Sequence, residues 1–439
     1  MRAGPVIAVR KTNDPEDLRQ IHRIRNLVFV DEQGFPPELE IANEEESIHF
    51  LAFSDQDPCG AARWRKTDKG FKLERFAVLK EFRSKGIGAA LLDAVLSDLP
   101  SGDDRVYLNA QLGAVSFYER FQFIQQGDIF VEAGIQHMQM AIPVVAFVTF
   151  EEKPDFAPDD LYFVNYLRKN NVRVDPVVWS EPWVDWTKFD LIVFRSIWDY
   201  YLKPEEFNQW LKQMKPAKLP FLNSLSVLEW NRDKKYLLSL RDAGIPIPEF
   251  EYCQHNTSCD LTSILDRMKE GTAVVKPSVS GGAYNTYLAS APVSVAEDEK
   301  FQSLLRRGSV IVQEFREEIK TNGEISLIFF DRVFSHAVQK VAMPGDFRVQ
   351  PKFGGKPLLV QASAEMINLA SAILNEVPEE LLYARVDLLL LEDGTYSLME
   401  LELIEPILFA EYEPKSPENF FRALMKFLRK QERQNQRSE

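Results

Sequence analysis

The sequence is poor in cysteine, in histidine and in long apolar runs. Its 439 residues include five histidines and three cysteines, Cys59, Cys253 and Cys259. Thiols this few and scattered exclude a disulfide framework or a zinc knuckle, so we expect structural cysteines. No apolar run reaches the roughly 20 residues of a membrane span, and the N-terminus lacks the apolar core of a signal peptide. We therefore expect a cytoplasmic protein without a membrane partner.

Positive charge is also in deficit. The chain has 52 lysines and arginines against 66 acidic residues, which gives a net charge of −14. A nucleic-acid-binding protein needs a basic face to neutralise phosphates, so this balance argues against a nucleic-acid partner. The 45% hydrophobic and 27% charged content is that of a soluble globular protein. We expect small-molecule partners, and a homodimer stays open.

The length and the patterning indicate at least two domains. Pro143 separates two strand-like runs, and because proline is not tolerated in a central strand we place a domain boundary there. Before Pro143 the patterns predict helices at about 15–29, 86–98 and 114–121 among several strands. After it, strands alternate with helices, which predicts a parallel βαβ-type sheet. The fold class is α/β (α+β).

A strand, a basic turn and a helix follow one another in FAVLKEFRSKGIGAALLDAVLSDL, residues 76–99. Arg83, Gly86 and Gly88 stand at the entrance of the helix. Glycine lets a ligand approach the backbone closely, and the free N–H groups of a first helical turn attract anions. This is a pyrophosphate site in outline, although a solvated turn with two glycines would look the same.

The surroundings favour the phosphate site. Val78, Arg83, Gly86 and Gly88 resemble the R/Q-x-x-G-x-G/A signature of GNAT-family N-acetyltransferases, as do the flanking segments 24–40 and 109–123. The resemblance covers residues 1–142 and implies acetyl-CoA as a cofactor. The residues that it implies for acetyl-CoA are Phe76, Val78, Arg83, Lys85, Gly86, Ile87 and Gly88.

The same resemblance implies two catalytic side chains. Tyr118 matches the family tyrosine that protonates the leaving thiolate, and a packed helix tyrosine is the alternative. Glu74 is a candidate base, acting directly or through water, and a solvated strand glutamate is the alternative.

Three glutamates stand in the otherwise apolar run LMELELIEP, residues 398–406. On a strand, Glu400 and Glu402 would share one face, with Met399 and Leu401 on the other. A solvated edge strand would show the same pattern. Glu405 lies further along and reads as a pocket or surface carboxylate.

The preceding segment makes these glutamates more informative. YARVDLLLLEDGTYSLMELEL, residues 383–403, predicts a hairpin that brings Arg385 and Asp387 beside Glu400 and Glu402. Clustered carboxylates need a cation, and oxygen ligands suit Mg²⁺ held with phosphates. The hairpin resembles the R-x-D and E-x-N elements of the ATP-grasp superfamily, with Glu402 in place of the amide. The resemblance implies Asp387, Glu400 and Glu402 as ligands of two Mg²⁺ ions, and Arg385 as catalytic.

Further segments resemble this superfamily in its own order. VLEWNRDKKYLLSL supplies Lys234, and AVVKPSVSGGAYNT supplies Lys276 and a glycine-rich flap. VIVQEFREEIKTNGE, residues 310–324, resembles the hinge whose backbone reads adenine and whose glutamate, Glu324 or secondly Glu318, holds the ribose. The implied ATP-binding residues are Lys234, Lys276, Ser280, Gly281, Gly282, Gln313, Glu314, Phe315, Glu318 and Glu324.

GDFRVQPKFGG, residues 345–355, resembles the RimK-like and glutathione-synthetase-like branches. Arg348 matches the arginine that steadies the transferred phosphate, and Gln350 replaces an asparagine. Other segments, among them FRSIWDYYLKPEEF, residues 194–207, look closest to the cycloserine-forming ATP-grasp ligases. The implied substrate residues are Arg195, Asp199, His336 and Gln350, with Trp198, Tyr200 and Lys340 as further candidates. A core cluster is the alternative for residues 195–200.

Together the resemblances imply a GNAT domain at 1–142, an ATP-grasp N-terminal subdomain at 143–228, nucleotide-binding and catalytic lobes at 229–430, and a polar tail at 431–439. We expect a bifunctional enzyme: an acetyl-CoA-dependent N-acyltransferase fused to an ATP- and Mg²⁺-dependent carboxylate–amine ligase that acts on amino-acid-like molecules through an acyl phosphate. The alternative is a ligase regulated by a non-catalytic, acyl-CoA-sensing GNAT domain.

Overall fold

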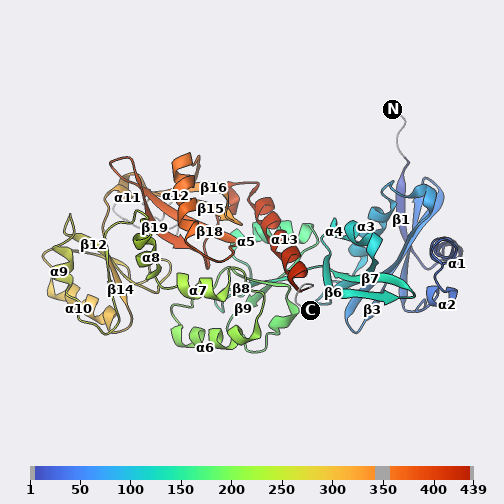
Figure 1. Ribbon diagram of the computed structural model, residues 1–439, viewed down its shortest axis with the longest axis horizontal. Coiled ribbons are helices and arrows are strands. Elements are labelled where there is room, and N and C mark those ends of the chain that lie inside the picture. Colours follow the sequence, from blue (N-terminus) through green and yellow to red (C-terminus); the bar gives the residue numbers. More distant parts are fainter. Residues whose placement is uncertain (1–4, 342–355, 436–439) are drawn as a thin grey trace. The chain divides into compact units, whose positions relative to one another are not determined.

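The computed structural model describes residues 5–341 and 356–435, so the predictions for Arg348 and Gln350 lie outside the described residues. The chain divides into two compact units (Figure 1). Unit 1 runs to Pro143 and includes the segment from Arg429 onward, and unit 2 is Val144–Leu428.

Unit 1 is built on a seven-stranded sheet in the order β1-β2-β3-β4-β5-β7-β6. Its strands are β1 (Ile7–Thr12), β2 (Ser47–Ser54), β3 (Asp57–Thr67), β4 (Gly70–Val78), β5 (Val106–Gln111), β6 (Ile124–Glu132) and β7 (Ile135–Ala141). Only β4 and β5 pair in parallel among these described strands, and their register joins Phe71–Leu73 to Val106–Leu108. The second half of β4 therefore extends past this parallel ladder.

Helices cover both faces of this sheet. They are α1 (Pro15–Arg25), the π-helix η1 (Asn26–Glu32), α2 (Pro37–Glu40), η2 (Lys80–Phe82), α3 (Ile87–Asp98), η3 (Leu112–Ala114) and α4 (Val115–Glu119). Leu91 and Val95 of α3 enter the core on one face, and Ile21 and Ile24 of α1 enter a smaller core on the other. The helix expected at 15–29 leaves α-helical geometry at Arg25 and continues as η1.

Unit 2 begins with the predicted parallel sheet, in the order β10-β8-β9. Its elements are β8 (Val144–Thr149), α5 (Pro158–Lys169), β9 (Arg173–Val178), η4 (Trp186–Lys188), β10 (Leu191–Phe194), α6 (Pro204–Met214) and η5 (Lys215–Ala217). Pro176 lies on β9, an edge strand, which is where a sheet tolerates proline. The aromatic residues Trp179, Phe207 and Trp210 pack together in the core of this part.

Two antiparallel sheets complete unit 2. The first has the order β11-β14-β12-β13 and the second the order β17-β16-β15-β18-β19. The first contains β11 (Phe250–Cys253), β12 (Thr272–Pro277), β13 (Tyr287–Ser290) and β14 (Val310–Glu314), with α9 (Leu261–Leu265) and α10 (Val295–Leu305). The second contains β15 (Glu324–Phe330), β16 (Val333–Val341), β17 (Lys356–Val360), β18 (Tyr383–Leu390) and β19 (Tyr396–Glu402), with α12 (Ala364–Asn375). The remaining helices are α7 (Leu225–Asn231), α8 (Tyr236–Asp242), α11 (Glu318–Thr321), η7 (Ala410–Tyr412) and α13 (Ser416–Asn435).

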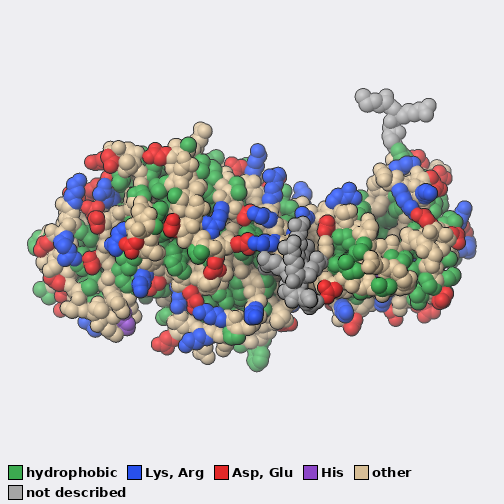
Figure 2. All heavy atoms as spheres, viewed as in Figure 1, with side chains coloured by type: hydrophobic (Ala, Val, Ile, Leu, Met, Phe, Trp, Pro, Cys, Tyr) green, Lys and Arg blue, Asp and Glu red, His purple; other side chains and the backbone are tan. Residues whose placement is uncertain are grey.

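The surface is charged and mixed. Acidic and basic side chains are interspersed over the face drawn in Figure 2. Within residues 5–341 and 356–435, no helix combines the length and the apolar character that crossing a bilayer requires.

Candidate active sites

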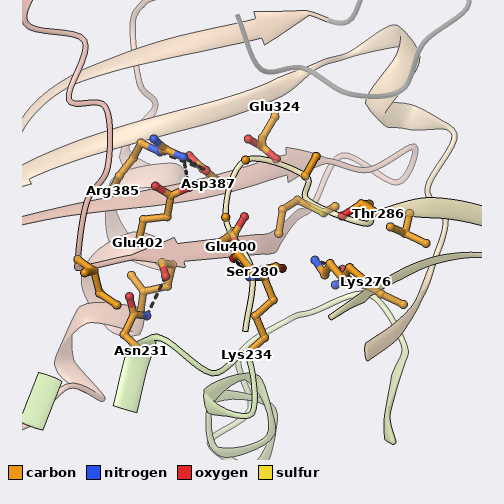
Figure 3. Close-up of a pocket in the computed structure, with 18 of the residues that line it drawn as sticks. Asn231, Lys234, Lys276, Ser280, Thr286, Glu324, Arg385, Asp387, Glu400 and Glu402 are labelled. Carbon is orange, nitrogen blue, oxygen red and sulfur yellow. Dashed lines mark hydrogen bonds and ion pairs between the residues drawn. The ribbon is translucent and has the colours of Figure 1, made fainter. Parts of the chain in front are cut away.

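Unit 2 contains a cavity of about 460 Å³ that both antiparallel sheets line. The loop after β10 contributes a further wall through Trp198, Tyr200 and Tyr201. Many residues assigned from the sequence line it, and Figure 3 shows several of them around one space. They are Lys234, Lys276, Ser280, Gly281, Gly282, Gln313, Glu314, Phe315, Glu324, Arg385, Asp387, Glu400 and Glu402.

The register of neighbouring strands brings the charged side chains of the cavity opposite one another. On β18 and β19, Asp387 lies opposite Glu400 and Arg385 lies opposite Glu402. On β15 and β16, Glu324 lies opposite Lys340. Since directly opposed residues on an antiparallel pair project to the same face, these strands present one surface of alternating charge to the cavity.

Asp387 is the most strongly held carboxylate of this surface. Arg385 Nε and Nη2 donate to it at 3.0 and 2.9 Å, Lys340 Nζ lies 3.4 Å away, and Ser326 donates a further hydrogen bond. Burial alone would raise the pKa of Asp387, but Arg385 and Lys340 outweigh burial and lower it to about 2. The carboxylate is thus charged across the physiological range.

A β-bulge in the hairpin corrects the expected face of Met399. Asp387 pairs with Glu400, whereas Leu388 pairs with Leu398, so Met399 is an extra residue on β19. Leu398 and Leu401 both enter the core, while Met399 lines the cavity beside Glu400. Strict alternation would have placed Met399 with Leu401, and the inserted residue breaks that alternation.

Two lysines approach Glu400 from outside the hairpin. Lys234 Nζ lies 3.2 Å from Glu400 Oε1 and donates to the Ser280 carbonyl at 2.8 Å. Burial lowers the pKa of Lys276, whose Nζ donates to Gln313 Oε1 at 3.1 Å. Burial alone would raise the pKa of Glu400, but Lys234 and Lys276 outweigh burial and lower it.

Glu402 and Glu405 behave differently from Asp387. Burial raises the pKa of Glu402 to about 7, against Arg385 and with help from Glu400 and Asp387. Burial and the charge of Glu402 raise the pKa of Glu405 to about 8. For both carboxyl groups, burial and neighbouring negative charges outweigh the nearby cations, so the protonated form is favoured more than for Asp387.

The hairpin carries the oxygen donors that Mg²⁺ prefers, and they meet on one face. In the described ranges, however, no three acidic, histidine or cysteine side chains stand close enough to enclose a metal ion. Asp387, Glu400 and Glu402 each contact a lysine or arginine instead. The donor set fits Mg²⁺ that arrives with a nucleotide, because phosphate oxygens can replace the carboxylates as partners of those cations.

The hinge also carries groups that fit a nucleotide. Gln313 is 2% exposed, and its Nε2 has no hydrogen-bond partner among the residues that the structure describes, so it offers a buried donor beside Lys276. The N–H of Glu314 already donates to the Glu249 carbonyl at 2.7 Å, and that of Phe315 to the Thr272 carbonyl at 3.0 Å. Strand pairing uses both N–H groups, so the prediction that this backbone reads adenine rests on the other backbone groups of the segment.

The glycine-rich flap lies close to an aromatic side chain. A Cβ on Gly281 would come within 2.8 Å of Tyr201 Cε1. Gly282 has φ +53°, a conformation that glycine adopts more easily than other residues. A side chain at position 281 would clash with Tyr201, and the backbone conformation at position 282 favours glycine.

Four predicted residues do not line the cavity. Arg195 is buried against Asp160 at 2.7 Å, and it also donates to the Pro406 carbonyl at 3.1 Å. Asp199 accepts from Trp179 Nε1 at 2.8 Å, and a ring nitrogen of His336 lies 3.0 Å from the Leu408 carbonyl. Glu318 pairs with Arg316 at 3.0 Å. Each of these side chains has a partner within the protein and lies outside the cavity lining, so their assignment to substrate or ATP stays a prediction.

In unit 1, the predicted phosphate loop lies at the start of α3. Gly86 precedes the helix with φ +89°, so the first-turn N–H groups of α3 face the loop. Phe76 and Val78 lie on the half of β4 that extends past the parallel ladder with β5. The end of β4 and the start of α3 are the two elements to which the sequence analysis assigned the thioester and the pyrophosphate of acetyl-CoA. Arg83 pairs with Glu32 at 2.6 Å and donates to the Val78 carbonyl at 2.9 Å.

The two proposed catalytic side chains of unit 1 differ in their surroundings. Tyr118 packs edge-on against Phe76, with ring centroids 6.1 Å apart, and burial raises its pKa, so it stays protonated as a general acid requires. Glu74 contacts Arg63 at 2.7 Å and Arg65 and Lys72 at 3.2 Å. Burial opposes these cations, yet they lower the pKa of Glu74 to about 2. Three cations thus favour the charged form of Glu74, which makes it a weak base.

The sequence analysis missed some residues that shape the site. Asn231 Oδ1 and Nδ2 pair with the Leu403 N–H and the Leu401 carbonyl, and the Tyr236 hydroxyl accepts from the Leu401 N–H at 3.0 Å. These side chains act as a further partner for β19. Nothing in the local pattern marks them, although both lie within the quoted segment that contains Lys234.

Comparison with known proteins agrees with this geometry. The family described as Acetyltransferase (GNAT) domain matches residues 28–144, and the family described as D-cycloserine synthetase DcsG, N-terminal domain matches residues 145–223. The Uncharacterized N-acetyltransferase YjcF of Bacillus subtilis is 40% identical over 128 residues, which is 28% of this chain and 91% of YjcF. The Cycloserine biosynthesis protein DcsG of Streptomyces lavendulae is 30% identical over 268 residues, which is 57% of this chain and 87% of DcsG.

A solved structure extends this likeness to the fold. The crystal structure of D-cycloserine synthetase DcsG superposes with a TM-score of 0.59 at 26% identity, covering 65% of this chain and 99% of that one. The predicted families and fold class are thereby confirmed. The chain belongs to the DcsG-like ATP-grasp ligases and carries, before the ligase part, a GNAT acetyltransferase domain.

Proposed function

We propose that this chain joins an amine to a carboxylate of an amino-acid-like substrate at the expense of ATP, and that its GNAT domain transfers an acyl group from acetyl-CoA to an amine. The observation that carries the ligase proposal is the meeting of Asp387, Glu400 and Glu402 with four cationic side chains in one cavity. These cations are Lys234, Lys276, Lys340 and Arg385.

The residues of the cavity have distinct tasks in this reaction. A carboxylate is a poor electrophile, so a phosphoryl group from ATP first converts it to an acyl phosphate, and the amine then displaces phosphate. Lys234, Lys276 and Arg385 neutralise oxygens whose charge changes during both steps. Asp387, Glu400 and Glu402 would hold Mg²⁺, which screens phosphate charge when bound.

An assay of ADP release tests the ligase. The full chain is incubated with ATP, Mg²⁺ and a panel of amino acids, and products are identified by mass spectrometry. We expect Asp387→Asn to lower ADP release by about 100-fold or more, because it removes the one carboxylate with which both Arg385 and Lys340 pair. Asp242→Asn, at an exposed position on α8, is the matched control. Equal ADP release from both variants contradicts the proposal, and so does a wild-type chain that releases no ADP with any candidate.

The state of Glu74 favours a second candidate function for unit 1. With its proposed base held by three cations, the GNAT domain could bind acyl-CoA and regulate the ligase without transferring a group. Tyr118→Phe separates the two functions. Loss of acetyl transfer in this variant supports an acetyltransferase, whereas a ligase that responds to acetyl-CoA equally in wild type and variant, without acetylated product, supports a sensor.

A further inference from the structure

Glu405 occupies a rigid segment at the edge of the ligase cavity. It follows β19, and its carbonyl accepts a hydrogen bond from Trp198 Nε1 at 3.2 Å. The next carbonyl, of Pro406, accepts from Arg195 at 3.1 Å, and the Leu403 N–H donates to Asn231 at 2.9 Å. Backbone held on both sides fixes the direction of the carboxylate, as a preorganised binding group requires.

The side chain of Glu405 has an aromatic environment. Glu405 lines the cavity together with Trp198, Tyr200 and Tyr201 of the loop after β10. Tyr200, which is 5% exposed, forms a side-chain hydrogen bond with the carboxylate, and the charge of Glu405 also acts on Tyr201. One partly buried acid therefore stands beside three aromatic rings.

Glu405 also differs from the other acids of the cavity in its partners. Glu324, Asp387, Glu400 and Glu402 each form an ion pair with a lysine or arginine. Within the part of the chain that the structure describes, no lysine or arginine lies within 4.0 Å of the Glu405 carboxylate. A carboxylate partly shielded from water gains most from a cationic partner, so a positive group of a ligand is the natural complement.

We propose that Glu405 and the rings of Trp198 and Tyr201 bind the ammonium group of the ligase substrate. This inference rests on the proposed ligase function and names the chemical class of the substrate, a molecule with a free, protonated amine. An ammonium group beside Glu405 favours its charged form, which then provides the counter-charge, and aromatic faces attract cations and exclude water. The acids of the cavity would repel the substrate carboxylate near Glu405. The substrate amine would therefore face Glu405, and its carboxylate would face the lysines and Arg385.

This arrangement gives an order to the two activities if they act on one amine. An N-acetylated amine carries no positive charge, so it cannot form an ion pair with Glu405 and should bind more weakly. The free amine would therefore pass through the ligase cavity before acetylation, and acetylation would disfavour rebinding of the product.

Isothermal titration calorimetry on the full-length chain tests this inference. Mg·ADP is titrated first, because its binding reports on the nucleotide site independently of Glu405. The Mg·ADP-loaded protein is then titrated with two pairs of probes: D-cycloserine and N-acetyl-D-cycloserine, and D-alanine and N-acetyl-D-alanine. The variants are Glu405→Gln and Tyr200→Phe, and Glu411→Gln, which removes an exposed carboxylate nearby in the sequence, is the matched control.

We expect wild type and Glu411→Gln to bind at least one free amine about 10- to 100-fold more tightly than its N-acetyl counterpart, the range that a hydrogen bond to a charged group provides. Glu405→Gln should lose this preference and keep Mg·ADP affinity, and Tyr200→Phe should reduce the preference by a smaller factor. A wild-type chain that binds Mg·ADP without preferring any free amine overturns the inference, as does an unchanged preference in Glu405→Gln. Absence of Mg·ADP binding in the wild type overturns the proposed ligase instead, and this inference with it.

Discussion

Replacement of Arg195 distinguishes a substrate residue from a structural anchor. Its side chain and that of Asp160 are each 2% exposed, and they meet at 2.7 Å. Arg195→Met leaves Asp160 buried without its closest cation, a loss of about 3–5 kcal/mol for a buried ion pair. The lost hydrogen bond to Pro406 adds about 1 kcal/mol. We therefore expect the free energy of unfolding of unit 2 to fall by about 4–6 kcal/mol.

Urea unfolding followed by tryptophan fluorescence measures this loss. Trp179, Trp186 and Trp210 pack in the core of the parallel sheet, so they report on the part that Arg195 supports. We expect the urea midpoint of Arg195→Met to fall by about 1 M or more. The double variant Arg195→Met with Asp160→Leu should recover most of the loss, because no unpaired charge stays buried.

Lys215→Met serves as the control for loss of an ion pair. Lys215 and Glu229 meet at 2.7 Å, but their side chains are 50% and 33% exposed, so the expected loss is below about 1 kcal/mol. Equal midpoints for Arg195→Met and Lys215→Met would refute the structural role of Arg195. A stable Arg195→Met chain with a raised KM for the amino-acid substrate would support substrate contact instead.

Two further predictions concern Glu74 and the flap. The pKa of Glu74 is about 2 in the folded protein, against an ordinary value of 4.5. The charged form of Glu74 therefore stabilises unit 1 by about 3 kcal/mol above about pH 5, and this stabilisation is lost as the pH falls toward 2. Glu74→Gln should remove that pH dependence, measured by hydrogen exchange of β3 and β4 peptides corrected for intrinsic rates, and an unchanged pH profile contradicts the ion-pair network. Gly281→Ala should raise the KM for ATP about tenfold, because about 1.4 kcal/mol of strain against Tyr201 corresponds to that factor. Gly308→Ala is the control and should leave the KM unchanged, since a Cβ at Gly308 would meet open space.

Short segments with a fixed internal spacing predicted most about this protein. The run from Phe76 to Gly88 predicted a strand, a phosphate loop and a helix, and β4, Gly86 and α3 follow that order. The hairpin of residues 383–403 was predicted from its turn and its charges, and Arg385 and Asp387 do lie opposite Glu402 and Glu400. Such patterns are visible in a sequence because neighbours along the chain determine them.

The sequence did not show the surroundings of a residue whose partners are distant in the chain. Arg195 bonds to Asp160 and to Pro406, which is 211 positions away, and no local pattern distinguishes such an anchor from a substrate arginine. Glu74 reads as a base on its strand, but the cations around it on β3 and β4 make it a weak one. Met399 changed faces because a single inserted residue shifts the register of β19.

The sequence by itself determined the two families, the α/β fold class, the parallel sheet after Pro143 and the residue types that can serve acyl and phosphoryl chemistry. Only the tertiary structure decided which charges are available to a ligand. Arg195, Asp199 and His336 already pair with groups of the protein, whereas Glu405 lines the cavity without an ion-pair partner in the described residues. The physical reason is that a charge acts through what surrounds it, and burial and partners come from segments far apart in the chain.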